Sequence, residues 1–184
     1  MLNHIRLTRA LLRNPKAIGT LVPSSRYLAA SMVELLPVGD QAAIVEFGGG
    51  TGPVTQAMLA SGFPPEQLYV FELSDQLSDH LRRRFPKVNI IHASAAEITS
   101  LACPVGGIIS SLPLRSLPET TVREILEASA NKLQAGGCFV QFTYDLMHYH
   151  PLFDTNFHHL SKKVVWANLP PARIDIFRKR AGAD

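Results

Sequence analysis

Cysteine is scarce in this chain of 184 residues. The two cysteines, Cys103 and Cys138, lie 35 positions apart, and neither belongs to a CxxC pair or to a Cys/His cluster with metal-ligand spacing. This arrangement argues against a disulfide framework and against a structural zinc site. We therefore expect a protein of a reducing compartment that holds no metal.

Long apolar runs are missing as well. No run approaches the ~20 residues that a bilayer-spanning helix needs, and residues 1–6 lack the apolar core of a secretory signal. We find no internal repeat and no low-complexity segment. With 46% hydrophobic and 18% charged residues the composition is typical of a folded cytoplasmic protein. The length favours a single domain over residues 1–184.

Acidic residues are missing from residues 1–33, which carry five basic ones. Residues 34–161 carry thirteen acidic against seven basic residues, and residues 162–184 carry six basic against two acidic ones. The net charge of +3 therefore hides two basic ends around an acidic middle. Such asymmetry suggests that at least one end of the chain meets an anionic surface.

Short apolar runs alternate with amphipathic segments, which indicates an α/β fold. Residues 42–47 precede a glycine cluster and predict a buried strand, and Pro53 suits the first turn of a helix over 53–60. Further strands are expected at 68–73, 88–93, 105–110 and 138–143, and further helices at 75–84 and 119–133. Strands separated by helices imply βαβ units and a parallel sheet.

The end of the chain departs from this alternation. Residues 161–167 and 172–178 are both strand-like, and only four residues join them. A link of that length is too short for a parallel crossover, so the two strands form an antiparallel hairpin. A parallel sheet that ends in a hairpin differs from the sheet of a dinucleotide-binding dehydrogenase.

The strongest motif is the glycine cluster after the first strand. Glu46 is followed by glycine at alternate positions, Gly48, Gly50 and Gly52. Glycine tolerates positive φ and lets a ligand approach the backbone, and the next helix offers free N–H groups. The fingerprint G-x-G-x-x-G would need glycine where Pro53 stands, and no P-loop lysine follows. We predict a nucleoside cofactor held by Glu46, Gly48, Gly49, Gly50 and Gly52.

Glu72 ends the second strand, twenty residues after Gly52, and Leu73 follows it. A carboxylate there can accept hydrogen bonds from both hydroxyls of a ribose. Together these residues resemble motif I and the following acid of class I S-adenosylmethionine-dependent methyltransferases. The resemblance implies S-adenosyl-L-methionine as cofactor, S-adenosyl-L-homocysteine as product, and contacts from Glu72 and Leu73. It also implies a Rossmann-like fold with a mostly parallel seven-stranded sheet, a C-terminal antiparallel hairpin and helices on both faces.

The third strand ends in a departure from that family. Many class I methyltransferases place an aspartate near position 94, where it accepts from the adenine amino group, whereas this chain has Ser94 followed by Ala95. A hydroxyl can also accept, though more weakly. The resemblance implies that Ser94 and Ala95 contact the adenine. A plain turn serine is the alternative.

The fourth strand leads into Ser110, Ser111, Leu112, Pro113 and Leu114. This segment resembles motif IV of amino-group methyltransferases, and ribosomal-RNA adenine dimethylases have Asn-Leu-Pro-Tyr there. Without the aromatic residue a flipped base loses a stacking contact worth ~1–3 kcal/mol, so a primary amine is the favoured acceptor. We predict that Ser110, Ser111, Leu112 and Pro113 hold the amine and that Ser110 also touches the cofactor. A purely structural turn is the alternative.

The N-terminal segment carries a basic stripe. At ~100° per residue, the four basic side chains of its first sixteen residues fall within roughly 80° of one helix face, opposite leucines. These residues are Arg6, Arg9, Arg13 and Lys16. Such a helix can lie in the interface of an anionic membrane, or it can pack on its own domain.

Residues 18–28, which contain Val-Pro-Ser-Ser-Arg, together with the glycine loop and Ser111 to Leu114 resemble small, soluble bacterial phospholipid N-methyltransferases. The resemblance implies methylation of phosphatidylethanolamine toward phosphatidylcholine by a peripheral protein on the inner face of the cell membrane. It also implies that the helical segment 1–36 covers the cofactor site, with Tyr27 over the cofactor and facing the amine and Arg26 at the lipid phosphate. Both side chains could instead pack for stability.

Two other functions stay open on the sequence alone. One is an N-methyltransferase for RNA adenine or a small amine, and the other is a non-catalytic, membrane-associated protein that binds a nucleoside. The expected partners are an anionic membrane surface and the phospholipid substrate, with no nucleic acid and no protein partner. Residues 144–150 follow the fifth strand and are candidates for the lining of the acceptor pocket.

Overall fold

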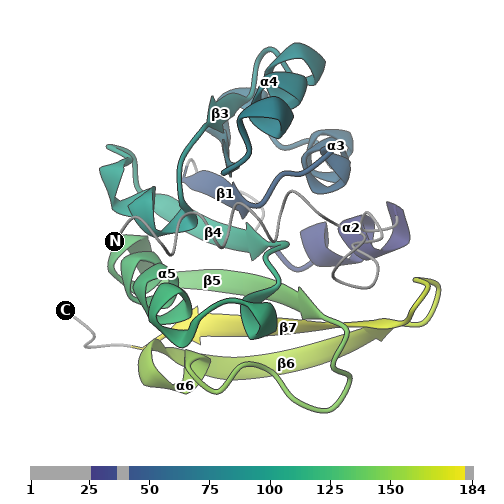
Figure 1. Cartoon of the computed structure of the whole chain (residues 1–184), viewed down its shortest axis with the longest axis vertical. Helices are drawn as coiled ribbons and strands as arrows, with labels where there is room; N and C mark the ends of the chain where they lie inside the picture. The colour runs from purple at the N-terminus through teal and green to yellow at the C-terminus, as the bar shows by residue number, and fades with distance from the viewer. Residues whose placement is uncertain (1–25, 37–41, 181–184) are drawn as a thin grey trace.

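A computed structural model describes residues 26–36 and 42–180 of the chain (Figure 1). In this part, seven strands form one sheet with the order β3-β2-β1-β4-β5-β7-β6. The strands are β1 (Ala43–Phe47), β2 (Leu68–Phe71), β3 (Asn89–Ile91), β4 (Val105–Ser110), β5 (Leu133–Thr143), β6 (Phe157–Val165) and β7 (Ala172–Lys179). Strands β1 to β5 are parallel, and β7 runs antiparallel between β5 and β6. The predicted parallel sheet with a C-terminal hairpin is confirmed.

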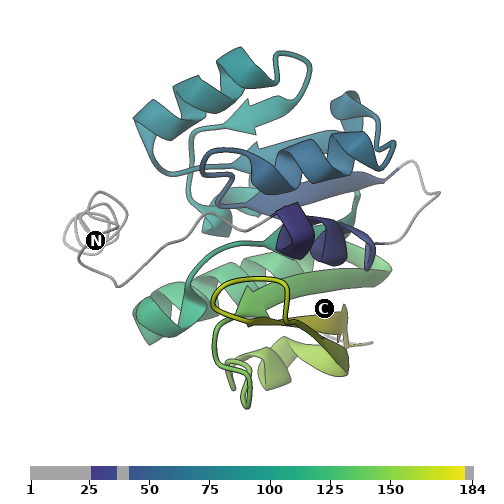
Figure 2. The ribbon, with the colours of Figure 1, turned by 90° about the vertical axis from the view of Figure 1, so that its right-hand side faces the viewer.

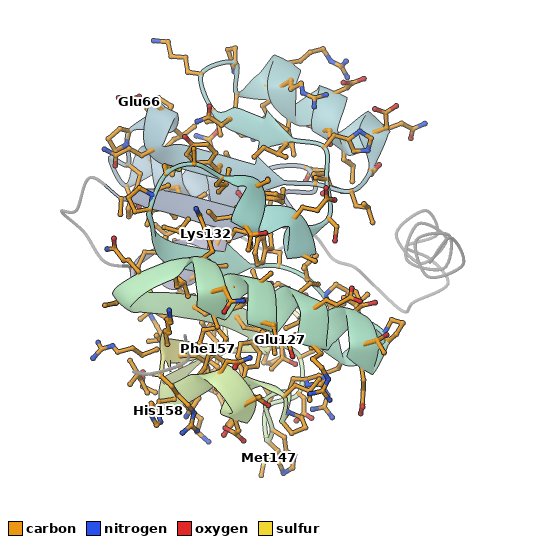
Figure 3. The ribbon with its side chains drawn as sticks, turned by 90° about the vertical axis from the view of Figure 1, so that its left-hand side faces the viewer. Glu66, Glu127, Lys132, Met147, Phe157 and His158 are labelled. Carbon is orange, nitrogen blue, oxygen red and sulfur yellow. The ribbon has the colours of Figure 1, made fainter. Side chains whose placement is uncertain are left out.

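Helices cover both faces of the sheet. The helices are α2 (Arg26–Val33), α3 (Pro53–Ala60), α4 (Asp75–Arg84), α5 (Glu119–Lys132) and the short α6 (Phe153–Asn156), with 3-10 segments η1 (Pro65–Gln67), η2 (Ala95–Ser100) and η3 (Leu114–Ser116). Figure 2 shows α2 and α3 in front of the sheet, and Figure 3 shows α5 in front of the opposite face. The core therefore forms two layers, one on each face of the sheet.

Aromatic rings attach α6 and the hairpin to the face that α5 covers. Phe153 of α6 stacks on Phe177 of β7 with ring centroids 3.9 Å apart, and Phe157 and Phe139 meet edge to face at 5.7 Å. All four side chains are fully buried. Aromatic pairs of this kind contribute about 0.5–1.5 kcal/mol beyond the area they bury. The C-terminal third of the chain is thereby fixed to the parallel sheet.

Two strands begin earlier than the sequence predicts. Strand β5 begins at Leu133, because Leu133 already pairs with Val105 before an irregularity that contains Gly136 at φ 79°. Strand β6 begins at Phe157, and a shift of register between His159 and Ser161 breaks its alternation of side chains. Irregular registers of this kind interrupt the alternation of apolar and polar residues on which strand prediction depends.

The described residues contain no helix long and apolar enough to cross a membrane. Within the same ranges, no three His, Cys, Asp or Glu side chains gather as ligands for a metal ion. Both cysteines are free thiols.

Candidate active site

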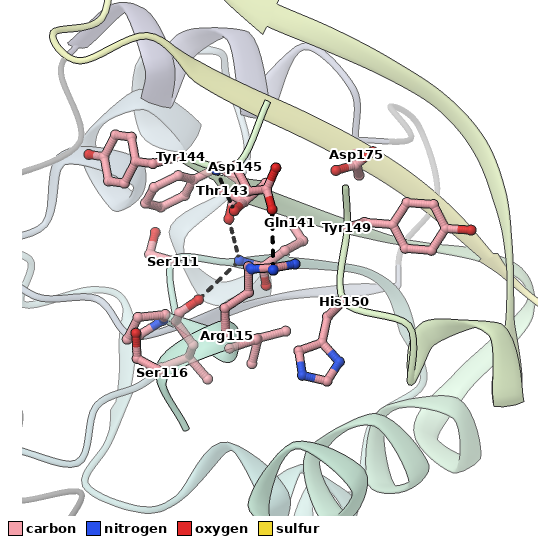
Figure 4. A pocket seen from close by; sticks show the side chains of 14 residues that line it. Ser111, Arg115, Ser116, Gln141, Thr143, Tyr144, Asp145, Tyr149, His150 and Asp175 are labelled. Atoms are coloured by element: carbon pink, nitrogen blue, oxygen red, sulfur yellow. Dashed lines mark hydrogen bonds and ion pairs between the residues drawn. The ribbon is translucent and has the colours of Figure 1, made fainter. Parts of the chain in front are cut away.

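Two adjoining cavities open where the parallel strands end at their carboxyl termini, the edge at which α/β sheets bind ligands. The first, here called the cofactor cleft, has a volume of about 320 Å³ and is lined by Gly48, Glu72 and the first turns of α5. The second, here called the acceptor pocket, has about 310 Å³ and lies beside β5 and β7 (Figure 4). Leu112 and Pro113 line both cavities, so the loop after β4 forms their common wall.

The glycine loop has the backbone that the sequence predicts. Gly48, Gly50 and Gly52 have φ of 75°, 56° and 88°, in the left-handed region that favours glycine. A Cβ on Gly50 would meet no atom within 4 Å. The backbone at Gly50 is therefore open to a ligand.

Close packing against core side chains of β2 and of the residue that follows α4 accounts for Gly49 and Gly52. A Cβ on Gly49 would lie 2.5 Å from Cγ1 of Val70, and a Cβ on Gly52 would lie 2.4 Å from Cε2 of Phe85. Both distances are shorter than real carbon contacts allow. These two positions therefore need glycine because the core approaches the backbone.

Glu72 lines the cofactor cleft, and backbone groups fix its carboxylate. The N–H of Gly50 donates to Oε2 at 2.9 Å, and the N–H of Ser74 donates to Oε1 at 2.8 Å. A carboxylate offers about four acceptor positions, so each oxygen retains one for a further donor. Glu72 is thus a rigid acceptor with spare capacity, as binding of two ribose hydroxyls requires. Leu73 lines the same cleft.

Replacement of Glu72 with Gln should weaken binding of S-adenosyl-L-homocysteine about 10- to 100-fold, a loss of roughly 1–3 kcal/mol. Glutamine has one oxygen, so its amide nitrogen would face one of the two backbone N–H donors. Isothermal calorimetry on the folded variant measures the loss. Glu66→Gln, an exposed change on η1, is the matched control. Equal affinity in the Glu72 variant and the wild type would remove Glu72 from the cofactor site.

Ser94 and Ala95 line the cofactor cleft, but the hydroxyl of Ser94 already has a local role. Its oxygen accepts from the N–H of Ala96 at 3.3 Å, and the carboxylate of Glu97 accepts from the N–H of Ser94 at 2.9 Å. This reciprocal pair is a capping box at the start of η2. Glu97, which was not predicted as a site residue, lines the same cleft. The Ser-x-x-Glu spacing was the available signal.

Glu46 of β1 lies on the face of the sheet that α3 covers, opposite the face that α5 covers. It lines neither cavity. Thr55 donates its hydroxyl to Oε2 of Glu46. Burial raises the pKa of Glu46 to about 8, and the nearby charge of Glu72 adds to the rise. In the described part of the chain, Oε1 of Glu46 has no hydrogen-bond partner. A cofactor contact at Glu46 stays a prediction.

The loop after β4 is tied to the end of β1. The N–H of Ser111 donates to the carbonyl of Phe47 at 2.9 Å, and the hydroxyl oxygen of Ser110 accepts from the N–H of Leu112 at 3.3 Å. Ser110 is fully buried and lines neither cavity, whereas Ser111 lines the acceptor pocket. Of the four residues predicted to hold the amine, Ser111, Leu112 and Pro113 are thus at the pocket surface.

Asp145 organises the segment that follows β5. Its Oδ1 accepts from the N–H groups of Met147 and His148 at 2.9 and 3.0 Å, and Arg115 lies 3.2 Å from its Oδ2. These backbone hydrogen bonds, aided by Arg115, lower the pKa of Asp145. The resulting turn brings Tyr144, Asp145, Tyr149 and His150 into the lining of the acceptor pocket.

A row of buried polar residues crosses β4, β5 and β7 beside this pocket. Ser110 pairs with Gln141 across β4 and β5, and Gln141 pairs with Asp175 across β5 and β7. Direct register partners present their side chains on the same face of a sheet. Neither Gln141 nor Asp175 was singled out from the sequence, because each stands inside an apolar strand pattern.

Gln141 and Asp175 each keep an oxygen that no neighbour satisfies. Nε2 of Gln141 donates to the carbonyls of Leu112 and Phe142, at 3.0 and 2.6 Å, which uses both of its N–H groups and fixes the orientation of the amide. Oδ1 of Asp175 accepts from Nε and Nη2 of Arg173, at 2.9 and 2.6 Å, and lies 2.7 Å from Nε2 of His159. Among the described residues, Oε1 of Gln141 and Oδ2 of Asp175 have no partner.

Tyr144, which also lines the acceptor pocket, carries a third unpartnered oxygen in its hydroxyl group. This oxygen too is buried, and within residues 26–36 and 42–180 it has no hydrogen-bond partner. A buried polar atom without a partner costs about 1–3 kcal/mol. Gln141, Tyr144 and Asp175, which all line the acceptor pocket, thus each carry one buried oxygen with unused hydrogen-bonding capacity.

Tyr27 and Arg26 lie at the start of α2 and line neither cavity. Nη2 of Arg26 donates to the hydroxyl of Tyr27 at 2.9 Å, and half of the Tyr27 surface is exposed. Their roles toward cofactor and lipid stay predictions. The basic stripe formed by Arg6, Arg9, Arg13 and Lys16 lies outside the described residues.

Comparison with known proteins places this geometry in context. No protein-family model matches the sequence. The curated ornithine lipid N-methyltransferase of Singulisphaera acidiphila is 27% identical over 164 residues, which cover 85% of each chain.

Solved structures agree on the fold. TrmN from Thermus thermophilus matches with a TM-score of 0.68 and 18% identity over 91% of this chain, which spans 52% of the length of TrmN. The N-methyltransferase NodS from Bradyrhizobium japonicum, solved with S-adenosyl-L-homocysteine, matches with a TM-score of 0.69 and 14% identity over 86% of this chain and 89% of NodS.

The chain therefore has the Rossmann-like fold of class I S-adenosylmethionine-dependent methyltransferases. The curated relative and NodS are N-methyltransferases by name, which agrees with the predicted enzyme class. S-adenosyl-L-homocysteine in NodS is the product form of the predicted cofactor.

Proposed function

We propose that this chain is an S-adenosylmethionine-dependent N-methyltransferase that acts on the primary amine of a membrane-lipid headgroup. The observation that carries the proposal is that three residues lining the acceptor pocket, Gln141, Tyr144 and Asp175, each carry a buried oxygen that has no hydrogen-bond partner among the described residues. Hydrogen-bond acceptors recognise N–H donors, and the pocket shares the wall of Leu112 and Pro113 with the cofactor cleft.

The residues of the cofactor cleft fit the cofactor. Glu72 offers two fixed acceptors, and the open backbone at Gly50 leaves space beside them. S-adenosyl-L-methionine supplies an electrophilic methyl group on a sulfonium. The protein has to bind the neutral amine with its lone pair directed at that methyl carbon.

Gln141 and Asp175 can orient the amine for this purpose. If Oε1 of Gln141 and Oδ2 of Asp175 accept its two N–H bonds, the lone pair on nitrogen stays free to form the new N–C bond as the C–S bond breaks. The positive charge passes from sulfur to nitrogen in this step. The carboxylate of Asp175 would face that charge through Oδ2, and the hydrogen bonds from Arg173 to Oδ1 hold the carboxylate in place.

Two lipids present this chemistry. The resemblance to phospholipid N-methyltransferases points to phosphatidylethanolamine, and the name of the relative at 27% identity points to ornithine lipid. Both carry an amine on a polar headgroup. The proposal is therefore stated for a lipid amine, and the test separates the two sources.

The test is methyl transfer by the purified full chain from labelled S-adenosyl-L-methionine. Separate reactions contain vesicles with phosphatidylethanolamine, vesicles with ornithine lipid, free ethanolamine, and an adenine-rich RNA. We expect label in one or both lipids and little in the soluble amine or the RNA. Label in RNA or soluble amine alone, or binding of the cofactor without any transfer, would contradict the proposal.

Replacement of Tyr144 with Phe should lower kcat/KM for the lipid amine about tenfold, the effect of roughly one hydrogen bond. The free energy of unfolding should be unchanged or higher, because the hydroxyl has no partner in the native protein. Urea unfolding and methyl-transfer kinetics measure the two quantities.

Tyr69→Phe is the matched control, since Tyr69 lines neither cavity. Its activity should equal that of the wild type. Wild-type kcat/KM in Tyr144→Phe would exclude the Tyr144 hydroxyl from amine binding.

A further inference from the structure

The turn between β6 and β7 exposes two large apolar side chains. Trp166 is 73% exposed and Leu169 is 83% exposed, the highest value among the exposed large hydrophobic residues. Residues 166–171, here called the hairpin tip, also contain Pro170 and Pro171. Paired exposed apolar side chains of this size commonly mark an interaction surface.

The hairpin tip is a well-defined turn. Asn168 is buried, and its Nδ2 donates to the carbonyl of Pro170 at 2.6 Å. Val165 and Ala172 close the base of the turn as a register pair and pack into the core. Asn168 points inward, and the side chains of Trp166 and Leu169, which flank it in the sequence, extend into solvent.

Two lysines lie beside the tip, and one of them is paired with an acidic residue of α2. Residues 160–171 contain Lys162 and Lys163, both exposed, and no acidic residue. Lys163 pairs with Glu34 of α2 at 2.9 Å, and both side chains are largely exposed. Tryptophan and leucine beside lysine form the combination that lies in the interface of an anionic bilayer, with the rings among headgroups and the lysines at phosphates.

The tip lies at the edge of the sheet where the active site opens. Because β5 and β6 both pair antiparallel with β7, β6 runs in the direction of β5. The end of β6 is therefore on the same side as the end of β5, from which the lining of the acceptor pocket continues. In Figure 1 the arrowheads of β4 and β5 and the yellow turn of the hairpin all lie at the right.

We propose that the hairpin tip inserts Trp166 and Leu169 into the headgroup region of an anionic bilayer and thereby presents the acceptor pocket to lipid amines. This inference rests on the proposed function and adds the surface through which the enzyme meets its substrate. It is independent of the basic stripe in residues 1–16.

Trp166 is the single tryptophan of the chain, so its fluorescence reports on the tip without a label. The probe is a vesicle of phosphatidylcholine and phosphatidylglycerol. Emission should shift to shorter wavelength on addition of these vesicles, and the shift should shrink in 1 M salt, where the Debye length falls to ~3 Å. Co-sedimentation with vesicles while the emission stays as in buffer would overturn the inference, and so would an absence of vesicle binding.

A pair of leucine variants tests the contact itself. Leu169→Asn should weaken the vesicle partition coefficient roughly tenfold, the effect expected when most of a leucine side chain is no longer buried. The control is Leu160→Asn, which changes an exposed leucine of β6 outside the hairpin tip. This variant should bind vesicles like the wild type. Wild-type partitioning of Leu169→Asn would overturn the inference.

Methyl-transfer assays distinguish a failure of the inference about the hairpin tip from a failure of the proposed function. We expect Leu169→Asn to lose transfer on vesicles and to retain it with a short-chain, water-soluble lipid amine. Full transfer on vesicles by Leu169→Asn would overturn the role of the tip and leave the proposed function standing. A tryptophan shift in a wild-type protein that transfers no methyl to any lipid would refute the proposed function instead.

Discussion

Replacement of Glu46 with Gln should make the protein more stable than the wild type at pH 8, by on the order of 4 kcal/mol, and should leave stability below pH 4 nearly unchanged. Burial raises the pKa of the native Glu46 carboxyl from 4.5 to about 8. Between these values the native state keeps a proton that the unfolded state has lost. The stability of the wild type therefore falls as the pH rises from 4.5 to 8.

Glutamine is a suitable replacement because it has the shape of the protonated carboxyl and does not titrate. Its oxygen can still accept from the hydroxyl of Thr55. Urea unfolding of both proteins at several pH values from 4 to 8 measures the difference, and Glu66→Gln controls for the loss of one exposed carboxylate. A stability difference that stays constant across this range would contradict the raised pKa.

Replacement of Gly52 with Ala should lower the free energy of unfolding by about 2–5 kcal/mol. About 1–2 kcal/mol of this comes from placing a Cβ at φ 88°, and the rest comes from collision with the ring of Phe85, 2.4 Å away. Thermal or urea unfolding measures the loss.

Gly62 provides a matched control, because its φ is 89° and a Cβ there would meet no atom within 4 Å. Gly62→Ala should show the backbone cost alone, about 1–2 kcal/mol. A double-mutant cycle with Phe85→Leu tests this contact. Phe85→Leu should recover part of the free energy of unfolding that Gly52→Ala loses, and none of the free energy that Gly62→Ala loses. Equal losses in the two alanine variants would show that the contact with Phe85 does not determine the choice of glycine at position 52.

The topology could be predicted because its signals are local. The glycine cluster after residues 42–47 marks a strand followed by a helix, and the four-residue link after 161–167 forces an antiparallel return. The structure confirms both features. The starts of β5 and β6 escaped prediction, because irregular registers near Gly136 and His159 interrupt the pattern of alternating side chains.

The acceptor pocket could be predicted only in part. Motif resemblance identified Ser110 and Ser111, but Ser110 at the end of β4 is fully buried and lines neither cavity, whereas Ser111 lines the acceptor pocket. Gln141 and Asp175 meet only through the register of β5 and β7, which a sequence does not display. A polar residue within an apolar strand was the available signal for both of them.

Different strands of the sheet supply the linings of the two cavities. Most groups that line the cofactor cleft come from the half built by β1 to β4 and the helix that follows β4, whereas Gln141 and Asp175 come from β5 and β7. Leu112 and Pro113 form the border between the halves. Under the proposed function, substitutions in β5 and β7 should change the range of acceptors while the half that lines the cofactor cleft stays unchanged, so that substrate choice can be engineered as a separate module.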